Sequence, residues 1–247
     1  MLKLSQPKPI LLEASECAVL LLHAYTSTVR DMRGLAEFLH RHGYTCYAIA
    51  YSGHGLDIDE FLNYTPVDWL QDSIKAYQHL LQRGYNQIAV IGVSLGAVLS
   101  LKLSEMLPIS ACIAMSTPQD RSTNDLFKRL ELYANYLGQF QNNNTKQNSA
   151  DLETKSSIQL QALQQLIRTT IQDTALISAP IFLLYGALDD VLYQSSAQTI
   201  YDHVNSTEKR IKNYPNTGHL MTLGQDQKQL FSDILDFLQQ HHPLQAE

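Results

Sequence analysis

A serine with a glycine two residues away on each side is the first group in this sequence that could perform covalent chemistry. Residues 92–96 (GVSLG) match the pattern G-x-S-x-G, after the apolar run 88–91 and before a segment of helical periodicity. A serine there must occupy a sharp turn, and the two glycines let strand and helix approach closely. The turn would expose the Ser94 hydroxyl and place the N–H of Leu95 at a helix N-terminus, where it could stabilise an oxyanion. We predict Ser94 as a nucleophile and Leu95 as an oxyanion donor; the alternative is a turn that only tightens the joint.

A serine hydroxyl is a weak nucleophile at neutral pH and needs a histidine as base. His219 lies in the loop between the last predicted strand and the last predicted helix, where open α/β sheets build their sites, so we predict it as the base. His54, between two glycines, is expected to brace a turn more than to line the site, and His23 to fix a loop by hydrogen bonding. The remaining histidines are expected to be solvated: His40, His42, His79, His203, His241 and His242.

The base in turn needs a carboxylate to orient it, and in this arrangement the chain order is serine, acid, histidine. A predicted strand, 181–185, is followed by a loop that carries both Asp189 and Asp190. We favour Asp189 and keep Asp190 as the alternative; either acid could instead cap the next helix. The second oxyanion donor is expected in the loop after the strand that ends at His23, and the backbone N–H of Tyr25 is the candidate.

These residues need a sheet that brings the ends of several strands together. Up to residue 118, apolar runs alternate with helix-period segments, which predicts an α/β fold with a mostly parallel, doubly wound sheet. The alternation returns at 179, so residues 119–178 are predicted to be a helical insertion and residues 1–118 and 179–247 the main domain. Within the insertion, the Asn- and Gln-rich stretch 138–149 is expected to form a mobile loop. The predicted strands are 17–23, 44–50, 87–92, 109–115, 181–185 and 208–215, and the predicted helices are 31–42, 66–83, 95–107, one after Gly186, and 223–240.

Composition excludes several classes of protein. Of the 247 residues, 45% are hydrophobic and 17% charged, and the formal net charge of −6 gives no broad basic surface for nucleic acid. No run approaches the roughly 18 apolar residues of a membrane span, so we expect no stable membrane insertion. The three cysteines lack paired spacing and are expected to be reduced and buried, in a cytoplasmic protein. No group of side chains has metal-ligand spacing, so neither a metal nor another cofactor is predicted.

Four segments resemble the α/β-hydrolase superfamily, and more narrowly its small bacterial carboxylesterases and monoacylglycerol lipases. LLLHAYTS resembles their oxyanion loop, GYTCYAIAYSGHG a strand with its G-H-G turn, IGVSLGA the nucleophile turn, and NYPNTGHLMTL the histidine motif. The resemblance also implies that the insertion is a small helical cap over the active site. Ala24 and Ser27 replace glycines of the usual loop, which concerns substrate range more than activity. The roles it implies are nucleophile for Ser94, acid for Asp189, base for His219, and oxyanion donors for Tyr25 and Leu95.

The sequence therefore predicts a serine hydrolase that cleaves carboxylic esters with short or medium acyl chains, or monoacylglycerols, through an acyl-enzyme on Ser94. A thioesterase, amidase or acyltransferase could use the same residues, because the fold does not fix the leaving group, and a catalytically silent binding module could keep the pocket. The expected partner is a small-molecule ester, and the expected assembly is a monomer or a weak homodimer. Seven residues of the insertion are expected either to face an acyl chain or to dock the insertion on the main domain: Leu126, Phe127, Leu130, Leu132, Tyr133, Tyr136 and Leu137.

Overall fold

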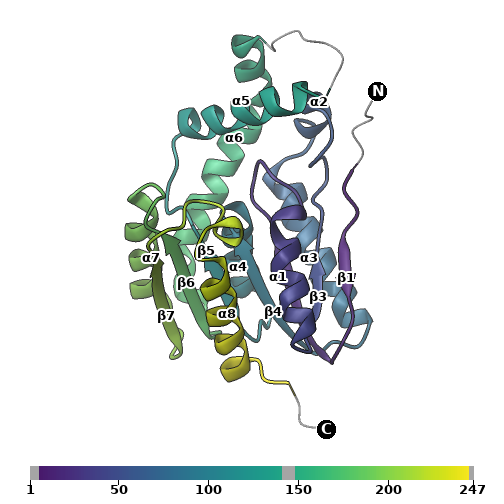
Figure 1. The fold of residues 1–247 in the computed structure, drawn as a ribbon. Coiled ribbons are helices and arrows are strands. Elements are labelled where there is room, and N and C mark those ends of the chain that lie inside the picture. Colours follow the sequence, from purple (N-terminus) through teal and green to yellow (C-terminus); the bar gives the residue numbers. More distant parts are fainter. Residues whose placement is uncertain (1–5, 141–147, 245–247) are drawn as a thin grey trace.

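Apolar residues alternate along the strands so that both faces of one sheet are buried. The computed structural model describes residues 6–140 and 148–244. In β2 (Cys17–Leu22), the even-numbered residues join one apolar cluster and the odd-numbered residues join the other. Because successive side chains of a strand point to opposite faces, such a strand needs cover on both sides. Helices supply that cover. In Figure 1, α1 (Arg30–Arg41) and α8 (Gln227–His241) lie in front of the sheet, and α3 (Pro66–Gln82) and α4 (Leu95–Met106) lie behind it.

The sheet has seven strands in the described part of the chain, in the order β1-β3-β2-β4-β5-β6-β7. Neighbouring strands pair in parallel except β1, which runs antiparallel to β3. Parallel neighbours need long crossover connections, and the helices between the strands provide them. The expectation of a mostly parallel sheet is confirmed. The other strands are β1 (Ile10–Leu12), β3 (Thr45–Ala48), β4 (Gln87–Val93), β5 (Cys112–Met115), β6 (Ile181–Gly186) and β7 (Lys209–Tyr214).

Helices occupy most of the remaining described chain. Those that follow β2, β4 and β6 correspond to predicted helices, and the last helix begins four residues later than predicted because residues 221–223 form a separate 3-10 turn. The helices are α1 (Arg30–Arg41), α2 (Ile58–Phe61), α3 (Pro66–Gln82), α4 (Leu95–Met106), α5 (Thr123–Gly138), α6 (Ser149–Gln172), α7 (Leu192–His203) and α8 (Gln227–His241), with 3-10 turns η1 (Thr174–Leu176) and η2 (Met221–Leu223).

Several local expectations were wrong. The short elements β1 and α2 were not predicted, since three or four residues are too few to show a period. His242 is fully buried, not solvated: its Nδ1 lies 2.8 Å from the Ser110 hydroxyl and its ring stacks on Tyr44 at 5.7 Å. The Tyr44 hydroxyl also donates to the carbonyl oxygen of His242 at 3.1 Å, a long-range contact that local polarity does not reveal. Burial lowers the pKa of His242 to about 4.

The insertion after β5 is helical, and α5 and α6 lie above the edge of the sheet at which β5 ends (Figure 1). Their buried residues, including Leu126 and Leu163, belong to the same apolar cluster as α3 and α4. Of the seven apolar residues singled out in α5, Leu132 and Tyr136 are instead 70% and 50% exposed, so they lie on the outer side. Most of the predicted loop 138–149 lies outside the described residues. Among the helices that are described, none is both long and apolar enough to cross a bilayer.

Candidate active site

Ser94 is the single residue between β4 and α4. Its backbone has φ 57° and ψ −114°, a conformation that a non-glycine residue adopts only under strain. The flanking glycines permit the turn, because a Cβ on Gly92 would lie 2.0 Å from the carbonyl oxygen of Gly96, and a Cβ on Gly96 would lie 2.0 Å from that of Leu22. No side chain fits at either glycine. The second contact presses the start of α4 against the end of β2 and so brings the loop after β2 beside the turn.

A second close approach joins the two loops that carry the predicted acid and base. Gly186 ends β6, and a Cβ there would lie 2.1 Å from the carbonyl oxygen of Thr217. The same oxygen accepts a hydrogen bond from the N–H of Leu188 at 3.0 Å. Since Leu188 directly precedes Asp189, and Thr217 is two residues before His219, these contacts hold the two side chains within reach of each other.

The structure brings Ser94, His219 and Asp189 into one chain of hydrogen bonds. The His219 Nδ1 lies 2.7 Å from the Asp189 Oδ2, and the His219 Nε2 lies 2.9 Å from the Ser94 Oγ. A carboxylate can only accept, so the imidazole proton belongs on Nδ1 and Nε2 is left as the acceptor for the Ser94 hydroxyl. The side chains of His219 and Asp189 are 17% and 6% exposed, so water competes little for these bonds. The arrangement can remove a proton from the Ser94 hydroxyl.

Asp190, the alternative acid, points elsewhere. Its Oδ2 pairs with the Arg121 Nη1 at 3.1 Å, and its Oδ1 accepts from the N–H of Leu192 at 3.0 Å. The second contact caps the start of α7, the role that was considered for either acid. The hydrogen bond from Leu192 and the neighbouring guanidinium of Arg121 lower the pKa of Asp190. Geometry therefore favours Asp189 as the partner of His219.

Two backbone N–H groups have no acceptor within the described residues: that of Leu95, which follows Ser94 and begins α4, and that of Tyr25, in the loop after β2, whose start packs against α4 at Gly96. Leu95 lies in the first turn of α4, where N–H groups have no intrahelical partner and carry partial positive charge. Both residues are buried, at 5% and 2% exposed, so leaving these donors without an acceptor is costly unless a ligand uses them. They suit an oxygen that carries negative charge.

His219 also contacts residues that the sequence did not single out. The centre of the Tyr193 ring lies 4.9 Å from the centre of the His219 ring. The Arg121 guanidinium lies over the same tyrosine ring, 4.8 Å from its centre. Burial lowers the pKa of His219, the hydrogen bond that its Nδ1–H donates to Asp189 opposes this, and the charges of Arg129 and Arg121 lower the pKa further. Tyr193 follows the acid by only four residues and could have been considered. The two arginines belong to the insertion, and no local pattern connects them to His219.

The two remaining histidines near the site act on the loop after β2, as expected. His54 is fully buried, and its Nε2 lies 2.8 Å from the carbonyl oxygen of Tyr25. Burial lowers the pKa of His54 to about 4, so the ring is neutral at pH 7 and its Nε2–H donates this bond. The His23 Nδ1 lies 2.9 Å from the carbonyl oxygen of Ala24. Both rings brace the loop that carries the Tyr25 N–H.

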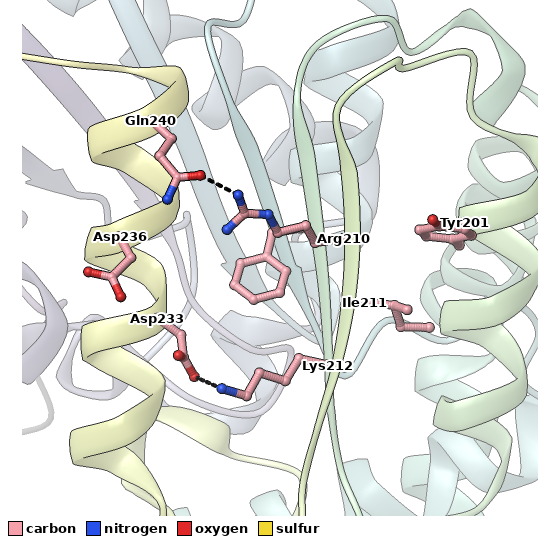
Figure 2. Close-up of a pocket in the computed structure, with 8 residues that line it drawn as sticks. Tyr201, Arg210, Ile211, Lys212, Asp233, Asp236 and Gln240 are labelled. Carbon is pink, nitrogen blue, oxygen red and sulfur yellow. Dashed lines mark hydrogen bonds and ion pairs between the residues drawn. The ribbon is translucent and has the colours of Figure 1, made fainter.

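A hollow of about 440 Å³ lies at another place, around the edge strand β7. Figure 2 shows two pairs of side chains joined across the gap between β7 and α8: Arg210 with Gln240, and Lys212 with Asp233. None of its lining residues touches Ser94, His219 or Asp189. The described residues contain no group of three or more His, Cys, Asp or Glu side chains placed to hold a metal ion.

The fold and this arrangement define a class of protein. A mostly parallel sheet with one antiparallel edge strand, a serine in a strained turn between strand and helix, and a helical insertion make up the α/β-hydrolase fold. The chain belongs to the serine aminopeptidase family S33, whose model matches residues 13–226. The resemblance noted in the sequence is thus confirmed at the level of the family.

Two relatives match almost the full length of the chain. A carboxylesterase of Bacillus subtilis (strain 168) is 32% identical over 242 residues, which cover 96% of this chain and 98% of the relative. A thermostable monoacylglycerol lipase of Bacillus sp. (strain H-257) is 29% identical over 245 residues and 96% of each chain. The chain is therefore a serine hydrolase of the type to which these esterases and lipases belong.

Solved structures agree with the fold. A structure reported for the metagenome-derived lipolytic enzymes LipS and LipT superimposes with a TM-score of 0.79 at 20% identity, over 97% of this chain and all of the other. A monoacylglycerol lipase from Paleococcus ferrophilus gives a TM-score of 0.68 at 16% identity, over 94% of this chain and 98% of the other. At these identities the likeness concerns the architecture alone.

Proposed function

We propose that the protein hydrolyses carboxylic esters through an acyl-enzyme on Ser94. The observation that carries this proposal is the chain of hydrogen bonds from Ser94 to His219, 2.9 Å, and from His219 to Asp189, 2.7 Å. A serine, a histidine and a carboxylate within this reach are the groups that activate a hydroxyl as a nucleophile. The names of the two full-length relatives, a carboxylesterase and a monoacylglycerol lipase, support an ester as the substrate.

The mechanism follows from the protonation states. The Ser94 oxygen attacks the ester carbonyl carbon while its proton passes to the His219 Nε2, which gives a tetrahedral intermediate with a negative oxygen. The C–O bond to the alcohol then breaks, and the imidazolium returns the proton to the leaving alcohol. The His219 Nε2 then removes a proton from water as the water oxygen attacks the acyl carbon. The bond from that carbon to the Ser94 Oγ breaks, the imidazolium returns the proton to Oγ, and the carboxylic acid leaves. Throughout the reaction the Asp189 carboxylate accepts a hydrogen bond from the His219 Nδ1–H, and its negative charge stabilises the imidazolium.

The backbone N–H groups of Tyr25 and Leu95 are proposed to bind the negative oxygen of both tetrahedral intermediates. They are buried and without an acceptor in the described chain, so they need no rearrangement when the charge develops. The positive end of α4 adds to this stabilisation.

We further propose that residues 119–178 form a cap over the active site of a main domain made of residues 1–118 and 179–247. Support comes from Arg121, which reaches the acid loop at Asp190, and from α5 and α6, whose apolar sides pack into the main cluster. We propose that this cap limits the length of the acyl chain that the site accepts. The expected substrates are therefore esters with short or medium acyl chains, or monoacylglycerols.

The proposal predicts a chain-length optimum. In a series of p-nitrophenyl esters from acetate to palmitate, kcat/KM is expected to peak at a short or medium chain, because a closed apolar pocket gains binding energy with each methylene only until it is full. The measurement is the initial release of nitrophenol at a fixed pH. Butyryl p-nitroanilide, followed by the release of p-nitroaniline, separates an esterase from an amidase, which would cleave both compounds.

If the wild type cleaves neither any ester of the series nor the anilide, ester hydrolysis is the wrong assignment. A thioester of the same acyl chain then tests the thioesterase alternative. Labelling of Ser94 by a fluorophosphonate separates a serine hydrolase with another substrate from a catalytically silent binding module.

A second prediction concerns pH. Burial, aided by the charges of Arg129 and Arg121, lowers the pKa of His219 below 6.5. Since the base acts when neutral, kcat/KM is expected to rise with pH through an apparent pKa below 6.5 and to be level at neutral pH. Arg129→Gln removes one of the positive charges that disfavour the imidazolium, so the pKa of His219 should rise. The acid limb of the kcat/KM profile of this variant is therefore expected to move to higher pH. Lys128→Gln, at the exposed neighbouring position, is the control and should leave the profile in place.

Stability must be followed over the same pH range. The pKa values of buried His54 and His242 are lowered to about 4, and burial also lowers the pKa of His23, so between about pH 4 and 6.5 these three groups bind more protons in the unfolded chain than in the folded chain. Glu105, whose pKa burial raises to about 7, acts in the opposite direction and offsets part of this difference. The free energy of unfolding is therefore expected to fall as the pH drops through this range. A circular-dichroism melt at each pH identifies any loss of rate that comes from unfolding. An acid limb above pH 6.5 in a folded sample would contradict the environment assigned to His219.

A further inference from the structure

The side chain of Tyr25 connects the loop after β2 to the insertion. Its hydroxyl donates a hydrogen bond of 2.7 Å to the Oε1 of Gln159, which belongs to α6. Both residues are buried, at 5% and 2% exposed. The residue whose N–H is proposed to bind the oxyanion is thus held by a residue of the insertion, 134 positions away in the sequence.

The amide nitrogen of Gln159 is held by two further hydrogen bonds. The Nε2 donates to the carbonyl oxygen of Tyr64 at 2.7 Å and to that of Phe61 at 3.2 Å. These two bonds determine which end of the amide faces Tyr25, because only the oxygen can accept the tyrosine hydroxyl. A buried polar network in which each member is satisfied specifies one geometry.

The backbone of Tyr25 is held as well. Its carbonyl oxygen accepts the hydrogen bond from His54, 2.8 Å, and its ring packs at 5.6 Å against both Phe61 and Trp69. Phe61 therefore contacts both Tyr25 and Gln159. The N–H of Tyr25 is the polar group of this residue that these contacts leave without a partner in the described chain.

We propose that Gln159 is a positioning residue for the oxyanion hole: through the Tyr25 hydroxyl, this residue of the insertion fixes the backbone N–H that binds the oxyanion. The inference rests on the proposed function and adds a link between the insertion and the reaction. Gln159 does not touch the substrate. It limits the movement of the loop that does, and a donor displaced by about 1 Å can lower the rate by about 10²-fold.

Two substitutions break the same hydrogen bond from opposite ends. Gln159→Met keeps the length of the side chain but removes its hydrogen bonds, and Tyr25→Phe removes one oxygen while leaving the backbone N–H in the chain. For either variant, kcat for the best p-nitrophenyl ester is expected to fall by about 10- to 10²-fold with KM changed by less than about threefold, because the lost interaction acts in the transition state. The double variant should be no slower than the slower single one.

A second readout separates positioning of the oxyanion donor from a general structural role. A trifluoromethyl ketone with the same acyl chain forms an adduct with the serine that carries an oxyanion, so its inhibition constant is expected to rise by the same factor by which kcat falls. The control is Lys155→Gln. It removes another contact between α6 and α2, the exposed ion pair of Lys155 with Asp59 at 3.2 Å, without touching Tyr25, and should leave kcat and the inhibition constant within about twofold.

The possible failures are distinguishable. If the wild type turns over esters and Tyr25→Phe, folded by circular dichroism, keeps its full kcat, the inference is wrong while the proposed function stands. An effect confined to KM, or additive effects in the double variant, would equally contradict it. Failure of the proposed function would instead appear as a wild type without turnover, or as turnover that survives Ser94→Ala. Where Gln159→Met does not fold, Tyr25→Phe alone decides, since it removes a single buried atom.

Discussion

Ser94→Ala is expected to lower kcat for ester hydrolysis by about 10⁴-fold or more, the largest effect predicted for any single substitution in this chain. The hydroxyl is the group that forms the covalent intermediate, so alanine leaves only the oxyanion donors and substrate binding to act on a direct attack by water. The alanine methyl fits where the serine was, because the φ of 57° is a property of the turn and not of the hydroxyl. The measurement is kcat on the preferred p-nitrophenyl ester, with KM expected to change little.

Ser116→Ala provides a matched control. Ser116 is the other non-glycine residue with positive φ in the described chain, at 47°, and like Ser94 it directly follows a central strand, although Ser116 is fully buried and Ser94 is only partly buried. Its hydroxyl has no hydrogen-bond partner among the described residues. The same substitution there should leave kcat within a few-fold and the melting temperature close to that of the wild type. A folded Ser94→Ala protein that retains more than a few per cent of wild-type turnover would show that another residue is the nucleophile.

The central strands and the turn at Ser94 could be predicted because their signals are local. The six residues of β2 are all buried, and such a continuous apolar run is typical of a strand covered on both faces. The turn is equally local, since its two glycines and its serine lie within five residues. The order of serine, acid and histidine along the chain then limited the other candidates to a few loops. Proximity of the three side chains depends on the close approach of Gly186 to Thr217, which no local pattern contains.

The contacts made by the insertion could not be predicted. Arg121, Arg129 and Gln159 are ordinary polar residues of helical or flanking segments by sequence, and each acquires its importance from a partner many residues away. His242 illustrates the converse error, since this residue of a polar tail was expected to be solvated and is fully buried. Periodicity indicates which face of a helix is apolar, but not which polar residue of that face finds a partner.

Asp189→Asn is expected to lower kcat by about 10³- to 10⁴-fold, the second largest effect. The amide of asparagine can donate to the His219 Nδ1, which moves the imidazole proton to Nε2. The protonated Nε2 can then no longer accept the proton of Ser94. The substitution is nearly isosteric, so the fold should be preserved. The observed geometry supports this choice of acid, because the Oδ2 of Asp189 lies 2.7 Å from Nδ1 on a side chain that is 6% exposed.

Asp190→Asn is the matched comparison, since it makes the same chemical change one residue later. Asp190 pairs with Arg121; the side chain of Asp190 is 48% exposed and that of Arg121 10%, so the pair is partly shielded from water and its loss is expected to cost on the order of 1 kcal/mol. Asparagine can still accept the hydrogen bond from the N–H of Leu192 and cap α7. The variant is therefore expected to keep kcat within a few-fold and to melt within a few degrees of the wild type. If Asp190→Asn lost activity and Asp189→Asn kept it, Asp190 would be the catalytic acid. The hydrogen bond between Asp189 and His219 would then be present in the resting enzyme but not used in catalysis.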